Sequence, residues 1–190
     1  MIKKKEKSSL ILRIHLAETV NRCLELLLSS DEIEKTIREV LRILCEFFSC
    51  RHACVFEADE SGNAVGLSYL YGADEGNRLK EAFDAVPIKE FTGWWNRYED
   101  HGIVFVRCPE STITSGSRSS LLKELGIRSV IAAPCFAEGT LQSILTIDAE
   151  DIEPENYDMI KQIAHTVDMA LVKNRENKSQ KSELVKPYVF

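Results

Sequence analysis

Apolar residues recur every three to four positions near both ends of the chain, and they form short runs in between. The three-four spacing predicts long helices over 10–28, 31–48 and 155–175. Short apolar runs bounded by Gly, Asn or Ser predict strands over 53–58, 64–71, 103–106, 129–134 and 139–148. Shorter helices are expected over 73–85, 90–99 and 119–125. The last two strands form a hairpin that turns at Glu138-Gly139.

This order of elements indicates the α+β class. We expect an antiparallel sheet of about five to six strands flanked by helices, with the N- and C-terminal helices forming a bundle. Val55-Phe56 and the run 131–135 are apolar at consecutive positions, so helices should cover both faces of the sheet. The predicted organisation is a disordered basic tail over 1–9, one domain over 10–175, and a polar linker or tail over 176–190.

The first helix carries a heptad-like seam with an asparagine at an inward position. One buried Asn in such a seam sets register and favours a dimer. The alternative is a single amphipathic helix that lies on its own domain. The last helix shows similar spacing, and the predicted dimer interface consists of Leu10, Ile14, Asn21, Leu24, Leu28, Ile163, Val167 and Asn174.

Composition narrows the functional classes. With 190 residues, 44% of them apolar, the chain is long enough for one sizeable core. A net charge of -6 without a basic patch speaks against nucleic-acid binding. No apolar run reaches 18 residues, so we expect no membrane span and no membrane partner. The six cysteines lie mostly in apolar segments, which is typical of reduced thiols in a cytoplasmic protein.

No catalytic constellation is apparent, and we predict no enzyme activity and no catalytic residues. The chain has no Ser-His-Asp order, no phosphate-binding glycine loop and no metalloprotease helix. Cys45, Cys50 and Cys54 lack the short Cys-x-x-Cys spacing of zinc sites, and His52 is their only local companion. We therefore predict no metal site and no cofactor.

The order of elements and several motifs resemble the GAF domain family, the small-molecule sensor modules of signalling proteins. The resemblance covers roughly residues 26–174. It rests on five features in order: Gly93, the Gly102-Ile103-Val104-Phe105-Val106 strand, Leu125-Gly126-Ile127, the strand that ends at Pro134, and the stretch from Gly139 to Asp148.

Some residues depart from the patterns of this family. Ser143 stands where the family often has Gly, and Arg107-Cys108-Pro109 follows a strand after which an Asp is common. The signatures of the cyclic-nucleotide and bilin branches are missing. The loop 110–118 has no cysteine, unlike relatives that reduce free methionine sulfoxide.

We expect an enclosed pocket for an unidentified small molecule. Of the adjacent Trp94 and Trp95, one can pack in the core while the other lines the pocket near Tyr69; simple core packing of both is the alternative. Arg107, Ser115 and Arg118 could hold an anionic group, or lie in a solvated loop. The predicted ligand-binding residues are Tyr69, Trp94, Trp95, Arg107, Ser115, Arg118 and Asp148, although Asp148 could instead serve as a turn or cap.

The resemblance implies a sensory module that relays ligand binding through dimerising helices to an output domain in cis or in trans. Diguanylate cyclases, histidine kinases and transcription regulators are examples of such outputs. Two alternatives stay open. One is a thiol-dependent enzyme similar to free methionine sulfoxide reductases, and the other is a ligand-free dimerisation module.

Overall fold

The structure is a computed structural model, which describes residues 2–72, 76–90, 99–100, 102–107, 117–149, 152–153 and 156–184. It has three long helices, α1 (Ile2–Ser29), α2 (Ile33–Phe48) and α6 (Tyr157–Leu184). Two shorter helices are α3 (Gly76–Ala82) and α5 (Ser117–Glu124). The strands are β1 (Ala53–Ala58), β2 (Ala64–Tyr71), β3 (Val86–Pro87), β4 (Glu99–Asp100), β5 (Ile103–Arg107), β6 (Ser129–Ala137) and β7 (Thr140–Ile147).

The described strands form one antiparallel sheet in the order β3-β2-β1-β7-β6-β5-β4. The expected α+β class with an antiparallel sheet is thus confirmed, and two-residue strands are added at both edges. The predicted turn between β6 and β7 is also present: Glu138 and Gly139 both have positive φ, at 51° and 79°. Two consecutive positive φ values are typical of a type I′ hairpin turn.

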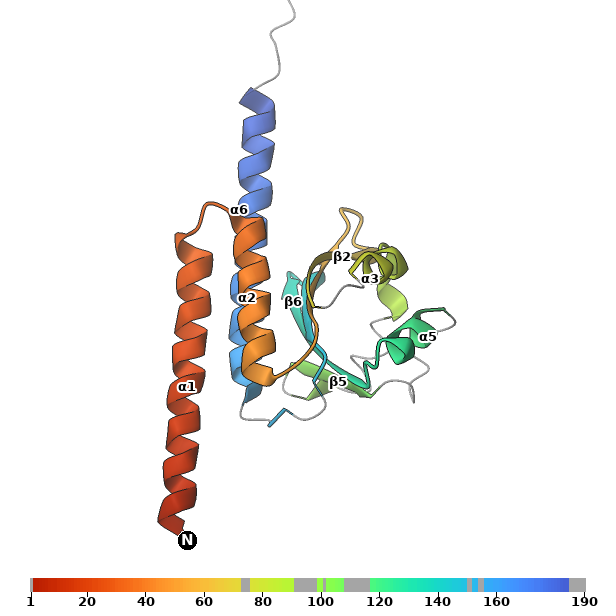
Figure 1. Ribbon diagram of the computed structural model, residues 1–190. Helices are drawn as coiled ribbons and strands as arrows, with labels where there is room; N and C mark the ends of the chain where they lie inside the picture. The colour runs from red at the N-terminus through yellow and green to blue at the C-terminus, as the bar shows by residue number, and fades with distance from the viewer. Residues whose placement is uncertain are drawn as a thin grey trace, which may run out of the picture.

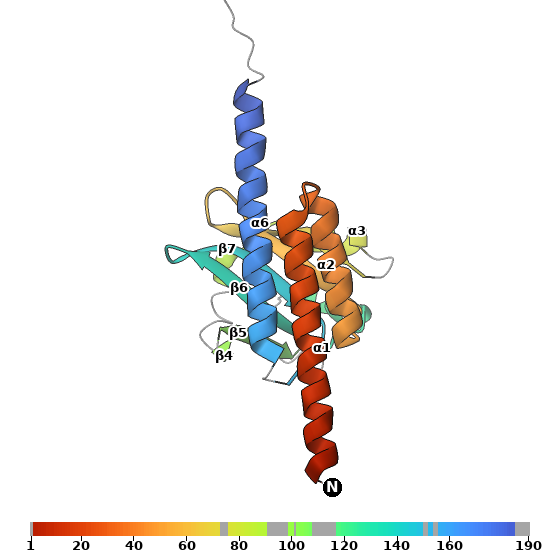
Figure 2. The same ribbon diagram turned by 90° about the vertical axis from the view of Figure 1, so that its left-hand side faces the viewer.

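The molecule is layered, as Figures 1 and 2 show. Helices α2 and α6 cover one face of the sheet, which we call the bundle face, and α1 packs outside them against both. Helices α3 and α5 lie on the other side of the curled sheet, which we call the ligand face because the sequence leads us to expect the pocket on this side. The N-terminal part of α1 runs past the sheet at one end of the molecule, and the C-terminal part of α6 runs past it at the other.

Each face of the sheet carries its own core. The bundle face buries an apolar stripe of α2 and α6 against β1, β6 and β7, and the fully buried members include Ile37, Leu44, Ile131, Ile147, Ile160 and Ile163. On the ligand face, leucines of α3 and α5 pack on alternate residues of the same strands, for example on Phe56 and Ile144. Because successive residues of a strand point to opposite faces, one strand serves both cores.

Both terminal helices are longer than the sequence predicts. Helix α1 begins at Ile2 where a disordered tail was expected, and α6 continues to Leu184, well beyond 175. Both extensions are rich in Lys and Glu, which are good helix formers, and neither contains Gly or Pro.

Helix α1 uses a different face from the predicted seam to contact its own chain. Val20, Cys23 and Leu27 are buried, whereas Ile14 and Leu28 of the seam are 52% and 70% exposed. Asn21 is also exposed, Leu24 is half-buried, and the side chain of Leu10 lies outside the described residues. The predicted seam therefore faces away from the domain.

The predicted interface residues of α6 are placed differently. Ile163 and Val167 are buried in the bundle-face core of their own chain, so they have no surface left for a second copy. Asn174 is half-buried. Among the described side chains of this helix, the large exposed apolar ones are Met169 and Val172, at 56% and 36%. Periodicity had identified the apolar stripe of α6 but not what it packs against.

The chain after α3 approaches β2 closely at Gly66. The Leu67 N–H donates to the Phe83 carbonyl at 2.9 Å, and a Cβ at Gly66 would lie 2.4 Å from the Asp84 carbonyl oxygen. We expect Gly66→Ala to lower the free energy of unfolding by about 1–3 kcal/mol because backbone must move. Urea unfolding measures this. The control is Gly139→Ala, where nothing lies within 4 Å of the added Cβ and only the positive φ costs stability, by about 1–2 kcal/mol. An unchanged stability of Gly66→Ala would contradict the close approach.

Candidate functional site

The candidate site lies where three chain connections meet at one end of the sheet: α2 to β1, α5 to β6, and the exit from β7. Helix α2 ends at Ser49, which has a left-handed backbone (φ 52°), and the Cys50 N–H donates to the Cys45 carbonyl at 3.0 Å. Arg51 and His52 follow this turn and lie directly before β1. Since β1 pairs with β7 antiparallel, His52 comes to lie opposite Asp148.

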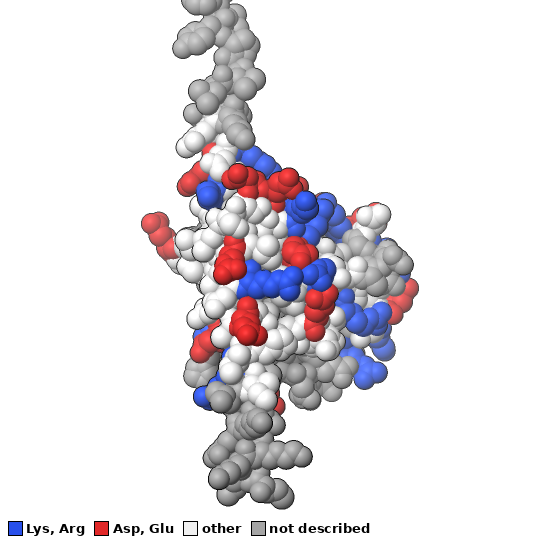
Figure 3. All heavy atoms as spheres, turned by 60° about the vertical axis from the view of Figure 1, so that its left-hand side comes forward, with Lys and Arg blue, Asp and Glu red and all other residues white. Residues whose placement is uncertain are grey.

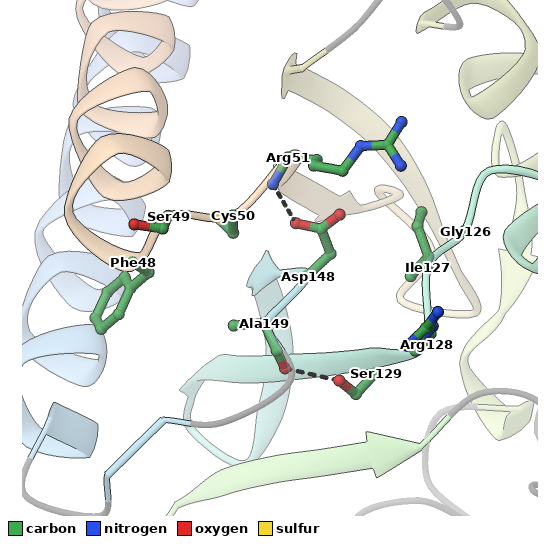
Figure 4. A pocket seen from close by; sticks show the side chains of 10 residues that line it. All are labelled: Phe48, Ser49, Cys50, Arg51, Gly126, Ile127, Arg128, Ser129, Asp148 and Ala149. Carbon is green, nitrogen blue, oxygen red and sulfur yellow. Dashed lines mark hydrogen bonds between the residues drawn. The ribbon is translucent and has the colours of Figure 1, made fainter.

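Asp148 binds this entry to β1 through three hydrogen bonds. Its Oδ1 accepts the backbone N–H groups of Arg51 and His52 at 2.9 and 2.8 Å, and its Oδ2 lies 2.8 Å from His52 Nδ1. Figure 4 shows the carboxylate turned toward the backbone of Arg51. Both side chains are buried, with 2% of His52 and 9% of Asp148 exposed. An ionised carboxylate can only accept, so Nδ1 carries the proton that it shares with Oδ2.

The other ring nitrogen of His52 has no partner in the part of the chain that the structure describes. Among the described residues, Nε2 is the one buried side-chain nitrogen or oxygen without a hydrogen bond. An unsatisfied buried polar atom costs about 1–3 kcal/mol. With the proton on Nδ1, the Nε2 atom of a neutral ring is a hydrogen-bond acceptor. In that neutral form, the site presents an acceptor that lacks a donor among the described residues.

His52 lies on the ligand face of the sheet. Ala53 belongs to the bundle-face core and Cys54 packs against the opposite core, so by strand alternation His52 shares the face of Cys54. Burial raises the pKa of Cys54 to about 12, and a hydrogen bond with Thr146 opposes part of that rise. Apolar residues of this face form one buried cluster, which includes Phe56, Val104 and Ile144. The face is thus an apolar wall with one polar corner, formed by His52, Cys54, Thr146 and Asp148.

A cleft of about 330 Å³ adjoins this corner. Arg51 reaches across it and donates from Nη1 to the Leu125 carbonyl at 3.3 Å, and Ser129 Oγ donates to the Ala149 carbonyl at 2.7 Å. The lining residues, shown in Figure 4, are Phe48, Ser49, Cys50, Arg51, Gly126, Ile127, Arg128, Ser129, Asp148 and Ala149. Two arginines and one satisfied carboxylate give the cleft a polar, net basic lining.

A comparison with protein-family models matches residues 32–171 to the GAF domain family. The match spans most of the chain. This chain belongs to the GAF domain family.

Solved structures agree with this assignment at the level of the fold. The chain is similar to the GAF domain of a phosphoenolpyruvate-protein phosphotransferase from Coxiella burnetii (TM-score 0.68, 12% identity, 87% of this chain and 98% of that chain covered). It is similar to the nlh2 GAF domain of A. aeolicus in an inactive state (0.63, 20%, 85% and 98%). It is also similar to free methionine-R-sulfoxide reductase of Neisseria meningitidis in complex with its substrate (0.63, 16%, 85% and 91%). No curated protein matches in a sequence search.

GAF domains occur in sensor and signalling proteins, which agrees with the coarse function expected from the sequence. No described helix is long and apolar enough to cross a membrane. Within the described part of this GAF domain, no three His, Cys, Asp or Glu side chains converge as a metal site would require.

Of the predicted ligand residues whose side chains the structure describes, Tyr69 and Asp148, only Asp148 lies at the candidate site. Tyr69 lies in β2 and packs in the bundle-face core, and burial together with nearby Glu57 raises its pKa to about 12. Arg107 ends β5 and Arg118 lies in α5, but their side chains are outside the described residues. Trp94, Trp95 and Ser115 are outside them altogether.

His52 is the site residue that sequence reasoning missed, because it was considered only as a companion of cysteines. Its partner Asp148 is 96 residues away, so no local motif joins the two. The available signal was the position of His52 directly before a strand, on the same face as Cys54.

Four of the five described cysteines, Cys23, Cys50, Cys54 and Cys135, do not have the properties of nucleophiles. Burial raises the pKa of Cys23 to about 11 and that of Cys135 to about 12, and contact with Cys45 together with burial raises that of Cys50. Nucleophilic thiols in enzymes have lowered pKa values, because the thiolate is the reactive form.

These pKa values predict slow alkylation of the native protein. At pH 8 only about one molecule in a thousand carries a thiolate at a thiol of pKa 11. We expect iodoacetamide to leave Cys23, Cys54 and Cys135 largely unmodified at pH 8, with rates that rise about tenfold per pH unit up to pH 10. Peptide mass spectrometry measures each site, and protein unfolded in urea is the control in which all three react. Rapid modification of any of them in the native state would show that its thiol is activated.

Proposed function

We propose that this GAF domain is a sensory module that binds a small molecule at the polar corner of its ligand face. The observation that carries the proposal is His52 Nε2, a buried acceptor without a donor in the part of the chain that is described. Buried polar atoms nearly always have a partner, so the missing one calls for a ligand or a bound water. Apolar walls with a few convergent polar groups are also what small-molecule sites require.

The chemistry of the corner indicates the class of ligand. Asp148 keeps the proton on His52 Nδ1, so a neutral His52 needs an N–H or O–H donor at Nε2. The wall of leucine, phenylalanine and isoleucine side chains suits an apolar or aromatic body. Arg51 at the adjoining cleft suits an anionic substituent, because its guanidinium can donate several hydrogen bonds. A heteroaromatic or amino-acid-like compound with one acidic group combines these features.

Two alternatives have less support. A thiol reductase similar to the Neisseria meningitidis protein would need a reactive cysteine; Cys108 lies outside the described residues, and four of the five described free thiols have raised pKa values. A ligand-free module agrees with the leucines of α3 and α5 that pack on this face, but it leaves His52 Nε2 without a hydrogen bond. An unsatisfied histidine would then lower stability without any return.

The surface of the helical layer supports a homodimer. Exposed apolar side chains gather on its two outward helices: Ile11, Ile14 and Leu28 of α1, and Met169 and Val172 of α6. Asn21 lies in the same seam of α1 and would fix the register of two copies. Figure 3 shows acidic and basic side chains interspersed over this layer. Ion pairs connect Arg22, Glu39, Arg42 and Glu46 and link α1 with α2. A second copy of this chain, with its own apolar seam, is the partner that fits.

We further propose that α6 carries the signal to an output domain, in cis or in trans. It packs on β6 and β7 and then leaves the body of the domain. A ligand transmits a signal only if it binds one arrangement of sheet and helix better than the other. The free cysteines suit the reducing cytoplasm, which is the compartment we propose.

A thermal-shift screen tests ligand binding. The probes are nucleotides, amino acids, haem and aromatic acids. A true ligand at a hundredfold excess over its Kd stabilises the native state by about 2.7 kcal/mol and raises Tm accordingly. We expect His52→Asn to lose this shift, because the amide keeps a donor for Asp148 but has no atom at the place of Nε2.

The outcome separates the alternatives. A compound that shifts the wild type and His52→Asn equally would show that His52 does not contact it. If no compound shifts the wild type, the ligand-free module becomes the better description. Ser61→Ala, in the exposed turn before β2, is the control variant that should keep the full shift.

Sedimentation tests the dimer. We expect the double variant Ile14→Asp, Leu28→Asp to be monomeric, since two carboxylates in an apolar seam cannot be buried without partners. Both residues are exposed within the monomer, so the fold should persist. The matched control is Phe136→Asp on β6, an equally exposed apolar residue (53%) outside the seam, which should leave the dimer intact. A double variant that stays dimeric would place the interface elsewhere.

A further inference from the structure

Helix α6 is tied to the sheet by a buried polar pair. Ser143 Oγ of β7 donates to Asp168 Oδ1 of α6 at 2.6 Å. Only 2% of Ser143 and 9% of Asp168 is exposed. The pair lies on the bundle face, where α6 otherwise packs through apolar residues such as Val167 and Leu171. A buried carboxylate is costly unless it is hydrogen-bonded, so this pair needs an explanation beyond stability.

The position of Ser143 in the sheet is central. It pairs with Glu57 of β1 on one side and with Cys135 of β6 on the other, next to a register shift between Cys135 and Phe136. Two turns further along α6, Arg175 Nη1 lies 3.8 Å from Glu57 Oε2. Glu57 and Ser143 are cross-strand neighbours, so α6 makes two polar contacts, through Asp168 and Arg175, with one pair of residues in the sheet.

Apolar packing alone would hold α6 in place only loosely along its axis. Its buried residues 160, 163, 164, 167, 170 and 171 repeat every three or four positions. A slide by one turn, about 5.4 Å, would exchange one apolar side chain for another. The same slide would move the Asp168 carboxylate away from Ser143 and leave it buried without this donor.

We propose that the Ser143–Asp168 pair fixes the register of α6 on the sheet, and that its opening allows the helix to shift. Setting register is the best-attested use of a buried polar contact. Ser143 is a positioning residue in this scheme, because it acts on the outgoing helix through Asp168. The proposal rests on the proposed function only in naming α6 as the output helix.

The Ser143–Asp168 pair is connected to the ligand face through β7 itself. Ile144, the next residue of β7, points into the ligand-face core, and Asp148 ends the same strand. A displacement of β7 by a ligand would therefore move Ser143 without any intermediate element.

Carbodiimide cross-linking reports the register without any ligand. Lys178 Nζ of α6 lies 3.1 Å from Glu34 Oε1 of α2, so the reagent should join them as an amide. Lys161 and Asp158, 2.7 Å apart within α6, provide an internal reference that no register shift can change. Peptide mass spectrometry gives the ratio of the two links.

We expect Ser143→Ala and Asp168→Ala each to reduce the ratio of the Lys178–Glu34 link to the reference. A hydrogen bond to a charged group contributes about a tenfold preference in equilibrium, so the equilibrium between the two registers should shift by about that factor, and the link should fall with the in-register fraction. The double variant should lose no more than either single one, because both remove the same contact. Ser143→Thr keeps a hydroxyl and should retain most of the link.

Thr166→Ala is the matched control, since Thr166 Oγ1 donates only to the Gln162 carbonyl of its own helix at 2.8 Å. If Ser143→Ala and Asp168→Ala unfold at lower urea but keep the wild-type ratio, the pair is merely structural and the proposal is overturned. If Asp168→Ala does not fold, Ser143→Ala with its smaller change decides the question. A ligand screen without a hit would count against the proposed function and not against this proposal. A wild-type ratio in the variants would count against this proposal and not against the proposed function.

Discussion

The pairing of β1 with β7 is the constraint on which the rest of the structure depends. It joins a strand near the start of the domain to one almost ninety residues later, and it unites the hairpin of β1 and β2 with that of β6 and β7. Closing so long a loop costs conformational entropy before any contact is gained. Asp148 lies directly at the end of this pairing, where its three hydrogen bonds fasten the first residues before β1 to the last after β7.

The two cores follow from that pairing. Strand β7 sits at the centre of the sheet, and alternation sends Ser143 and Leu145 to the bundle face and Ile144 to the ligand face. The layers that carry α6 and α5 thus share one strand as a common wall. In the proposed function, only β7 therefore separates the ligand from the output helix. Close-packed interiors transmit such displacements because they contain little free volume.

Local patterns were sufficient for the elements of the fold. The stripe of α2 and the Glu138-Gly139 turn can be read from neighbouring residues, because helix period and turn chemistry are local properties. The partner of an apolar stripe is not local. Ile163 and Val167 were correctly identified as an apolar stripe, but the stripe fits a dimer or its own sheet equally well, and the structure packs it on the sheet. The ends of α1 and α6 were missed because polar helix formers look like linker.

The candidate site was less predictable for the same reason. Tyr69 was expected in the pocket, but a register shift between Val55 and Phe56 decides which face each residue of β2 takes, and a one-residue slip reverses the faces. It places Tyr69 opposite Val55, on the bundle face. Asp148 could be found from its place at a strand end. His52 was missed, since its role depends on a contact with a residue 96 positions away.

The two polar features of the sheet have a thermodynamic connection. His52 and Asp148 meet where β1 and β7 are paired, so in the proposed function a donor that satisfies Nε2 would bind that paired state and not a frayed one. By linkage, such a ligand stabilises the pairing by as much as the pairing strengthens its binding. Ser143 belongs to the same pairing, opposite Glu57. In the proposed function, a ligand at the corner would therefore bias the Ser143–Asp168 pair through β7 itself, and the bias cannot exceed the difference in ligand affinity between the two arrangements.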